Sequence, residues 1–442
     1  MSTADAPKKP RETDDVPVPA TLRKSLKNRH IQLIALGGAI GTGLFYGSSE
    51  SIALAGPSIL LAYLVGGLAI FAIVRALSEM SVEDPKAGAF SYYATRYWSK
   101  RAGFISGWNY WFNYILVSMV ELSVVGKFVN YWFPAIPTWV SAAVFLVIIC
   151  AANLLGVSKF GEFEFWAAMI KVVALLSFLV AGTIFLAGRY QIDGHSTGFS
   201  VLNDNGGLFP TGLLPLVVVT SGVVFAYAAV ELVGTAAGET AEPEKVMPRA
   251  INSVIARIAL FYVGSLFLLA LLLPYTSYSA AESPFVTFFG KIGITGGGTV
   301  MNLVVMTAAF SSLNAGLYST GRILRSMATN GSAPKFTGLM SRRGVPYGGI
   351  CLTASIGLLG VLLNGVVPEK AFEIVLNVAS LGILSSWATI VICQIQLYRW
   401  SQQGRMERPS FRMWGSPYTG YLTLVFLFAV LVLMAFNRPI GT

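Results

Sequence analysis

The sequence predicts an all-α membrane protein, and three observations lead to that prediction. Of its 442 residues, 55% are hydrophobic and only 12% are charged, and the mean hydropathy is +0.65. This apolar content exceeds what the core of an ordinary soluble domain uses. The apolar residues gather in about eleven stretches, each near the roughly 20 residues that a helix needs to cross a bilayer. None alternates polar and apolar residues as barrel strands do, so a β-barrel and a string of soluble domains are both excluded.

Glycine, proline and charged residues mark the loops between the expected helices. We expect spans at 31–48, 57–77, 103–132, 138–155, 163–187, 213–237, 250–273, 299–325, 347–364, 371–397 and 419–436. Residues 1–30 are polar and rich in Lys, Arg, Pro and Asp, and they lack the short apolar core of a secretory signal. They are expected to form a disordered cytoplasmic tail.

The distribution of basic residues predicts the orientation in the membrane. If the loops alternate between the two sides, 24 Lys and Arg residues fall on the side of the amino-terminal tail. Only Arg189, Lys291, Lys370 and Arg438 fall on the other side. Because cytoplasmic loops are enriched in Lys and Arg, we expect the amino terminus inside the cell and the protein in the cytoplasmic membrane. The net charge of +10 is then an orientation signal, and no nucleic-acid partner is needed to explain it.

The cysteine and histidine content excludes several kinds of site. Cys150, Cys351 and Cys393 all lie in apolar stretches, whereas His30 and His195 lie in polar segments far apart. This is too little material for a disulfide framework or a Cys/His metal site. The spans also assemble no Ser/His/Asp or Cys/His catalytic set. We therefore expect no metal, no cofactor and no enzymatic activity.

Span 1 contains a glycine cluster in the middle of an apolar helix, at residues 37–43. One interpretation is close helix packing, because Gly37 and Gly41, and also Gly43 and Gly47, have the spacing of small residues at helix interfaces. The other is a helix unwound at Gly41, Thr42 and Gly43, whose freed amides bind a carboxylate.

Span 6 carries small residues around an acid, Glu231, and it stands five spans after span 1. Matching interruptions in two five-helix halves are typical of transporters built from inverted repeats, with the site between the broken helices. The halves would be 31–187 and 213–397, with 419–436 peripheral. We expect Glu231 to brace the unwound backbone. Phe225 adjoins the break and either closes over a ligand or packs against its surroundings.

Two charged residues lie deep in other spans, where unpaired charge is costly. Lys171 is expected roughly 12 Å inside span 5, either as part of a permanent ion pair or as a group that exchanges a proton. Glu121 in span 3 is a candidate for contact with a substrate ammonium, for pairing with a basic group or for carrying protons. Asn314 and Ser380 either contact the substrate or link helices as buried polar groups.

Four segments together resemble bacterial amino acid permeases of the amino acid, polyamine and organocation superfamily. They are residues 29–45, 231–239, 248–253 and 283–286, and the likeness extends over nearly the whole chain. The resemblance implies a leucine-transporter-like fold, with ten core helices in two inverted halves plus peripheral helices. The family usually has twelve spans, whereas this sequence reaches an eleventh and stops at Thr442.

The resemblance also implies roles for individual residues. The backbone of Gly41, Thr42 and Gly43 would hold the substrate carboxylate. The carbonyls of the unwound part of span 6, which includes Ala226, Tyr227 and Ala228, would hold its ammonium, and Phe225 would act as the gate. Lys171 would occupy the place of a sodium ion in sodium-coupled relatives, which favours the proton as the driving ion.

The resemblance points to two substrate classes. Residues 250–255, 311–318 and 372–377 resemble asparagine permeases, whereas residues 118–122 resemble aromatic amino acid permeases. We expect a proton symporter that imports a neutral amino acid, with L-asparagine favoured because its likeness covers the longer part of the chain. Selectivity would come from Glu121, Phe225, Tyr227, Asn314 and Ser380. The alternatives are a permease for aromatic or other neutral amino acids, an exchanger and a channel.

Overall fold

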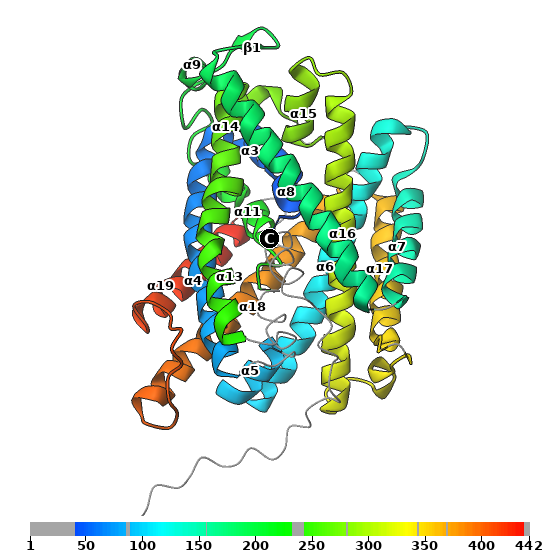
Figure 1. Cartoon of the computed structure of the whole chain (residues 1–442), viewed down its shortest axis with the longest axis vertical. Helices are drawn as coiled ribbons and strands as arrows, with labels where there is room; N and C mark the ends of the chain where they lie inside the picture. The colour runs from blue at the N-terminus through cyan, green and yellow to red at the C-terminus, as the bar shows by residue number, and fades with distance from the viewer. Residues whose placement is uncertain are drawn as a thin grey trace, which may run out of the picture.

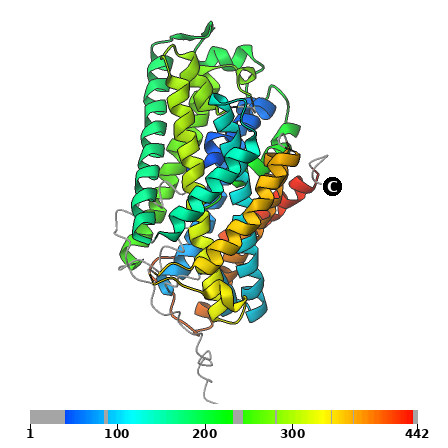
Figure 2. The ribbon, with the colours of Figure 1, turned by 90° about the vertical axis from the view of Figure 1, so that its right-hand side faces the viewer.

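The computed structural model describes residues 40–84, 89–155, 157–231, 243–279, 282–342, 344–367 and 370–436. These residues form an elongated bundle of helices that run close to its long axis (Figures 1 and 2). The expected tail 1–30, the start of the expected span 1 and the end of the expected span 6 lie outside the described residues.

The described elements of the first part of the chain, up to Ala187, are all helices or helical turns. Its elements are α2 (Thr42–Phe45), α3 (Gly47–Ala55), the 3-10 turn η1 (Gly56–Ser58), α4 (Ile59–Glu83), α5 (Ala89–Tyr97), α6 (Lys100–Trp132), α7 (Thr138–Leu154) and α8 (Val157–Ala187). The chain turns between α3 and α4 at Gly56, whose φ of 63° is a left-handed value that glycine adopts at little cost.

The second part begins with a small hairpin, β1 (Gln191–Ile192) and β2 (His195–Ser196), which pair in antiparallel fashion. Its helices are α9 (Phe199–Asp204), α10 (Leu214–Val218), α11 (Thr220–Ala226), α13 (Pro243–Arg257), α14 (Ser265–Leu272), α15 (Pro284–Lys291), α16 (Gly297–Thr329), α17 (Tyr347–Val366), α18 (Ala371–Gln402) and α19 (Tyr418–Ala435). A π-helical stretch, Ile258–Gly264, joins α13 to α14. Short 3-10 turns occupy Tyr275–Ser277 and Lys335–Gly338.

Eight helical stretches among the described residues are long and apolar enough to cross a membrane. Four of the eleven expected spans differ from this set. Spans 1 and 2 fall in one helical stretch, Thr42–Glu83. Span 4 becomes α7, which has 17 residues, and α11, the described helix of span 6, ends at Ala226. The chain is therefore a multi-pass membrane protein with an all-helical transmembrane region.

Several helices extend beyond their expected ends, and serine explains two of these extensions. The first span continues to Ala55 instead of residue 48, and the second to Glu83 instead of residue 77. The serines near those expected ends donate their hydroxyls to carbonyls four residues earlier, as Ser51 does to Gly47 and Ser81 to Leu77. Such bonds satisfy a hydroxyl inside a helix, so serine does not end it.

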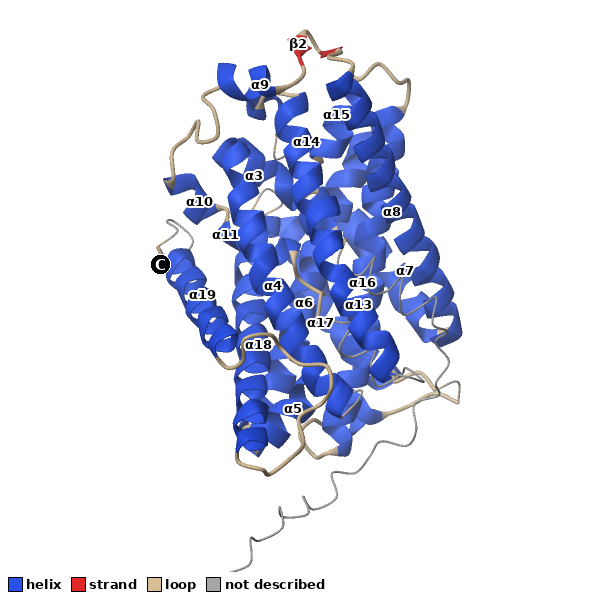
Figure 3. Ribbon diagram, turned by 60° about the vertical axis from the view of Figure 1, so that its left-hand side comes forward, coloured by secondary structure: helices blue, strands red, loops and turns tan. Residues whose placement is uncertain are grey.

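Helix α6 lies at the centre of the bundle, where it packs against α16, α18, α7 and α17. The short helices α2 and α11 contact each other, and α2 also contacts α16. Helix α19 lies at the periphery, against α18 and α4 (Figure 3). One end of the bundle carries α5, and the opposite end carries the hairpin, α9 and α15 (Figure 3). At that opposite end, Lys291 forms an ion pair of 2.8 Å with Asp193.

Candidate functional site

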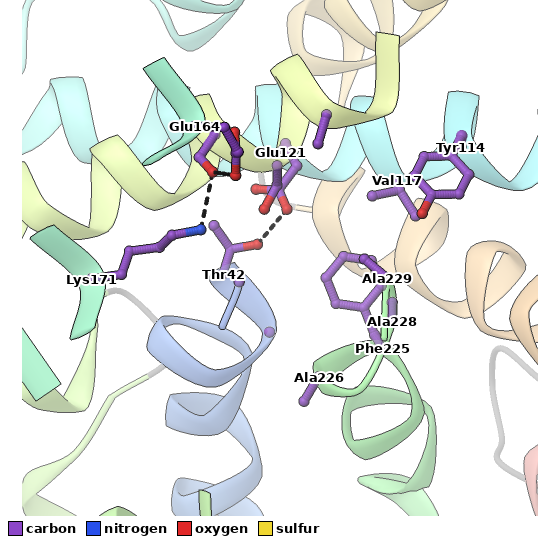
Figure 4. A pocket seen from close by; sticks show the side chains of 15 residues that line it. Thr42, Tyr114, Val117, Glu121, Glu164, Lys171, Phe225, Ala226, Ala228 and Ala229 are labelled. Atoms are coloured by element: carbon purple, nitrogen blue, oxygen red, sulfur yellow. Dashed lines mark hydrogen bonds between the residues drawn. The ribbon is translucent and has the colours of Figure 1, made fainter. Parts of the chain in front are cut away.

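A cavity lies where the amino end of α2 meets the carboxyl end of α11, between α2, α6, α8, α11 and α16 (Figure 4). Its lining residues are Gly41, Thr42, Gly43, Tyr114, Val117, Glu121, Glu164, Lys171, Phe225, Ala226, Ala228, Ala229, Ser311, Ser312 and Ala315. Eight of them were candidates from the sequence, namely Gly41, Thr42, Gly43, Glu121, Lys171, Phe225, Ala226 and Ala228. Segments far apart in the sequence thus converge on one interior site.

The first break lies at Gly41. This residue is extended, with φ of −114° and ψ of −171°, and the helix begins at Thr42, which is 1% exposed. The first amides of a helix have no acceptor within it, and they form the positive end of its dipole. The amino end of α2 is therefore suited to hold an anionic group in the cavity.

The glycines of this segment have different surroundings. A Cβ atom at Gly43 would lie 2.4 Å from Cα of Ala226 and 3.1 Å from the carbonyl oxygen of Phe225. Gly43 is thus required for the close approach of α2 to α11. A Cβ atom at Gly41 would meet only Oγ of Ser312, at the ordinary contact distance of 3.4 Å. Gly43 therefore lies in a close contact between α2 and α11, whereas the backbone at Gly41 has room beside it.

The second break follows α11, which ends at Ala226. Residues 227–231 form turns, and Ala229 has a φ of 67°, an unusual value for a residue with a side chain. Glu231 accepts a hydrogen bond of 3.3 Å from Nε1 of Trp387, and the amides of Ala229 and Glu231 also stabilise its carboxylate. Glu231 is not among the described residues that line the cavity, and its carboxylate contacts Trp387 and the backbone of residues 229–231.

Three buried charged residues face the cavity from α6 and α8. Glu121, Glu164 and Lys171 are each 1–2% exposed. Thr42 donates its hydroxyl to Oε1 of Glu121 at 2.8 Å, and Oε2 of Glu121 has no hydrogen-bond partner among the described residues. Nζ of Lys171 donates to Oγ of Ser311 at 3.0 Å, and that hydroxyl donates to Oε1 of Glu164 at 2.5 Å. Figure 4 shows Lys171 pointing toward Glu164, and Thr42 toward Glu121.

Three candidate side chains, those of Tyr227, Asn314 and Ser380, are not among the described residues that line the cavity. The hydroxyl of Tyr227 donates to the carbonyl of Tyr63 at 2.7 Å, and its ring stacks on Tyr262. The hydroxyl of Ser380 donates to the carbonyls of Ser221 and Leu376. Oδ1 of Asn314 accepts from Asn153 at 2.7 Å. The hydroxyls of Tyr227 and Ser380 and Oδ1 of Asn314 thus bond to neighbouring helices, whereas Nδ2 of Asn314 is buried without a hydrogen-bond partner among the described residues.

Sequence reasoning missed Glu164, Ser311 and Ser312. The expected start of span 5 at residue 163 placed Glu164 at the membrane surface. Because α8 begins at Val157, Glu164 instead lies about 10 Å along the helix. The seven-residue spacing from Glu164 to Lys171 is a signal that was available in the sequence, because it places both on one face of a helix.

Comparison with known proteins identifies the family. The amino acid permease family matches residues 30–441. L-asparagine permease 1 of Mycobacterium bovis is 59% identical over 425 residues, which are 96% of this chain and 87% of the relative. L-asparagine permease of Escherichia coli is 51% identical over 421 residues, 95% of this chain and 84% of the relative. L-asparagine permease of Streptomyces coelicolor is 50% identical over 446 residues, 100% of this chain and 91% of the relative.

These matches span almost the whole chain at high identity, and the cavity between two broken helices provides an interior site for a small solute. The family consists of transporters, so the protein moves an amino acid across a membrane and is not an enzyme. The chain belongs to the amino acid permease family.

Proposed function

We propose that the protein imports a neutral amino acid, L-asparagine, by proton symport. One observation supports this most strongly: the amino end of α2 and the carboxyl end of α11 meet at the same cavity. The positive end of one helix dipole and the negative end of another complement the two charges of an amino acid zwitterion.

Backbone groups of the protein bind the α-carboxylate and the α-ammonium, which all amino acids share. The amides at Thr42 and Gly43 hold the α-carboxylate, while the carbonyls at the end of α11, including those of Ala226 and Ala228, hold the α-ammonium. The carbonyl of Ala226 already accepts a hydrogen bond of 3.0 Å from Tyr262, and its second lone pair remains for the substrate. Phe225, on the cavity wall, closes over the bound amino acid.

The side chain of the substrate is read by polar groups on α6 and α16. Oε2 of Glu121 is buried and without a partner among the described residues, and it accepts from the carboxamide nitrogen. A site with such a group discriminates against ligands that leave it unpaired, at a cost of about 1–3 kcal/mol. The printed names of the relatives, L-asparagine permeases, support the same substrate. An aromatic substrate would instead use the apolar wall at Val117 and Phe225.

The driving ion is the proton, and Lys171 and Glu121 form the coupling centre. Lys171 places a cation beside α2 and α16, where a sodium ion would otherwise have to sit. The helices form a leucine-transporter-like fold of eleven spans, in which the halves 31–187 and 213–397 are inverted repeats and 419–436 is peripheral. Transport proceeds as one group of helices rocks against the other around the central site.

The end of the bundle that carries α5 faces the cytoplasm, and the protein lies in the cytoplasmic membrane with its amino terminus inside. The support is the enrichment of Lys and Arg on this side. Cysteine introduced at position 291 should react with an impermeant reagent added to intact cells, and cysteine at position 335 should not. The reverse pattern would overturn this orientation.

Uptake by purified protein in proteoliposomes tests the function. Labelled L-asparagine should accumulate inside when the outside is more acidic, and a proton ionophore should abolish the accumulation. Competition by each common amino acid then ranks the substrates. Competition by phenylalanine or tyrosine but not by asparagine would contradict the substrate. Exchange without net accumulation would identify an exchanger, and single-channel currents would identify a channel.

A further inference from the structure

The charged groups around the cavity do not balance. Among the described lining residues, the side chains that carry charge are Glu121, Glu164 and Lys171. If all three are ionised, the site holds one more negative charge than positive. All three are almost fully excluded from solvent. A net charge in such a place is unfavourable unless a proton or a cation neutralises it.

Among the described residues, the groups packed around this trio supply no further compensating charge. Helix α16 contributes the hydroxyls of Ser311 and Ser312, helix α2 the hydroxyl of Thr42, and helix α6 the neutral phenol of Tyr114. Asn314 interacts with Glu164 through a neutral amide, and Asn153 of α7 in turn binds Asn314. Lys127 of α6 lies farther along that helix than Glu121 and donates to the hydroxyl of Tyr46 at 2.8 Å.

The two carboxylates have different positions within the trio. Glu164 and Lys171 both contact the hydroxyl of Ser311, which fixes them as a bridged pair within α8 and α16. Glu121 lies on another helix, binds Thr42 through one oxygen and leaves the other without a partner in the described part of the chain. The substrate cannot cancel the excess negative charge, because an asparagine zwitterion is neutral overall. A proton can.

We propose that Glu164 sets the proton requirement of transport by serving as the counter-ion of Lys171, so that the site closes around substrate only when Glu121 is protonated. This inference rests on the proposed proton symport. A proton from outside adds to Glu121, substrate binds, and the occluded complex is neutral. On the inside, substrate and proton leave, and Glu121 is again a carboxylate. In the empty site water takes the place of the substrate and solvates this carboxylate, so the empty protein returns without the proton. Lys171 keeps its ammonium charge throughout.

The decisive variant is Glu164→Gln. The amide keeps the shape of the side chain and an oxygen that accepts from Ser311, but it removes one negative charge. Lys171 and ionised Glu121 then balance each other without a proton. We expect this variant to equilibrate asparagine across the membrane, yet to lose accumulation driven by a pH gradient. A pH-sensitive dye inside the proteoliposomes should report proton entry with asparagine for the unmodified protein and none for the variant.

Two controls separate charge from shape and position. Glu164→Asp retains the charge and should retain proton-driven accumulation. Glu162→Gln removes a charge from the same helix at a residue that does not line the cavity, and it should behave like the unmodified protein. Exchange of labelled for unlabelled asparagine, measured without a gradient, should persist in all three variants.

The outcomes distinguish the inference from the proposed function. If the unmodified protein shows no proton-driven accumulation, or requires sodium, the proposed symport is wrong. If it is proton-driven and Glu164→Gln remains equally so, with the same proton entry, the role of Glu164 is wrong. If Glu164→Gln is folded but exchanges no asparagine, Glu164 is needed for binding or translocating the substrate and not for proton coupling. The inference is then also overturned.

Discussion

Two buried glutamates show how differently the same side chain is used in this protein. Glu79 on α4 is 0% exposed and Glu121 on α6 is 2% exposed. Glu79 accepts hydrogen bonds from Nε of Arg408 at 2.5 Å, from Gln394 at 2.9 Å and from the amide of Met413 at 2.8 Å. Glu121 accepts one, from Thr42, and its second oxygen has no hydrogen-bond partner among the described residues.

The difference separates a structural acid from a functional one. Glu79 has a counter-ion and several donors, so it has no capacity left for a ligand. It holds the segment between α18 and α19 against α4, where Arg75 also stacks on Phe411 and Trp414. Glu121 borders a cavity, and its Oε2 accepts no hydrogen bond from the described residues. Burial alone therefore does not identify a functional acid, whereas an unsatisfied oxygen facing a cavity does.

The largest effect on stability is expected for Glu79→Ala. Removing one partner of a buried pair leaves the other unpaired, at a cost of about 3–5 kcal/mol. The thermal unfolding midpoint of the purified protein should drop sharply. Glu407→Ala, which removes an exposed acid from the same segment, should change stability by no more than about 0.5 kcal/mol. Equal midpoints for the two variants would show that the Glu79 cluster does not stabilise the fold.

Lys171→Ala should impair transport strongly, in contrast to Glu79→Ala, whose main effect is on stability. The variant leaves Glu121 and Glu164 without the cation between them. Proton binding and substrate binding should then no longer affect each other. Coupling between sites is typically worth about 1–3 kcal/mol, or about 5–150-fold. Accumulation under a pH gradient should fall by that order, while equilibrium binding of asparagine falls less. Normal accumulation by the variant would remove Lys171 from the coupling centre.

The two glycines of the first break should differ in the size of their effects. Gly43→Ala forces a movement of the backbone of Ala226, and overpacking of this kind costs about 1–3 kcal/mol. Uptake and stability should both decrease. Gly41→Ala adds a methyl group at an ordinary contact distance, so stability should persist while asparagine affinity falls. Equal losses of stability in the two variants would contradict the assignment of Gly43 alone to packing.

The smallest effect is expected for Trp387→Phe. It removes the 3.3 Å hydrogen bond to Glu231, and such bonds contribute about 1 kcal/mol. The unfolding midpoint should decrease slightly, and the order in which amino acids compete for uptake should not change. A changed order would mean that Glu231 contacts the substrate and is not only a brace.

Sequence periodicity predicted the helical class and most helix positions, because a bilayer requires long uninterrupted apolar helices. It was less accurate at the ends. The expected start of span 5 lay six residues after Val157, and this error concealed Glu164. Hydropathy marks where a helix leaves lipid, whereas a helix buried against others carries polar residues well inside its length.

The sequence by itself determined the membrane class, the family and the residues at the two helix breaks, because glycine, small residues and buried charges are costly in a spanning helix and therefore conspicuous. Only the tertiary structure decided which polar groups have partners. The hydroxyl of Ser380 bonds to α11, whereas Oε2 of Glu121 and Nδ2 of Asn314 have no hydrogen-bond partner among the described residues. Hydrogen bonds between helices depend on distances of a few ångströms between segments far apart in the chain, and no local pattern of residues encodes them.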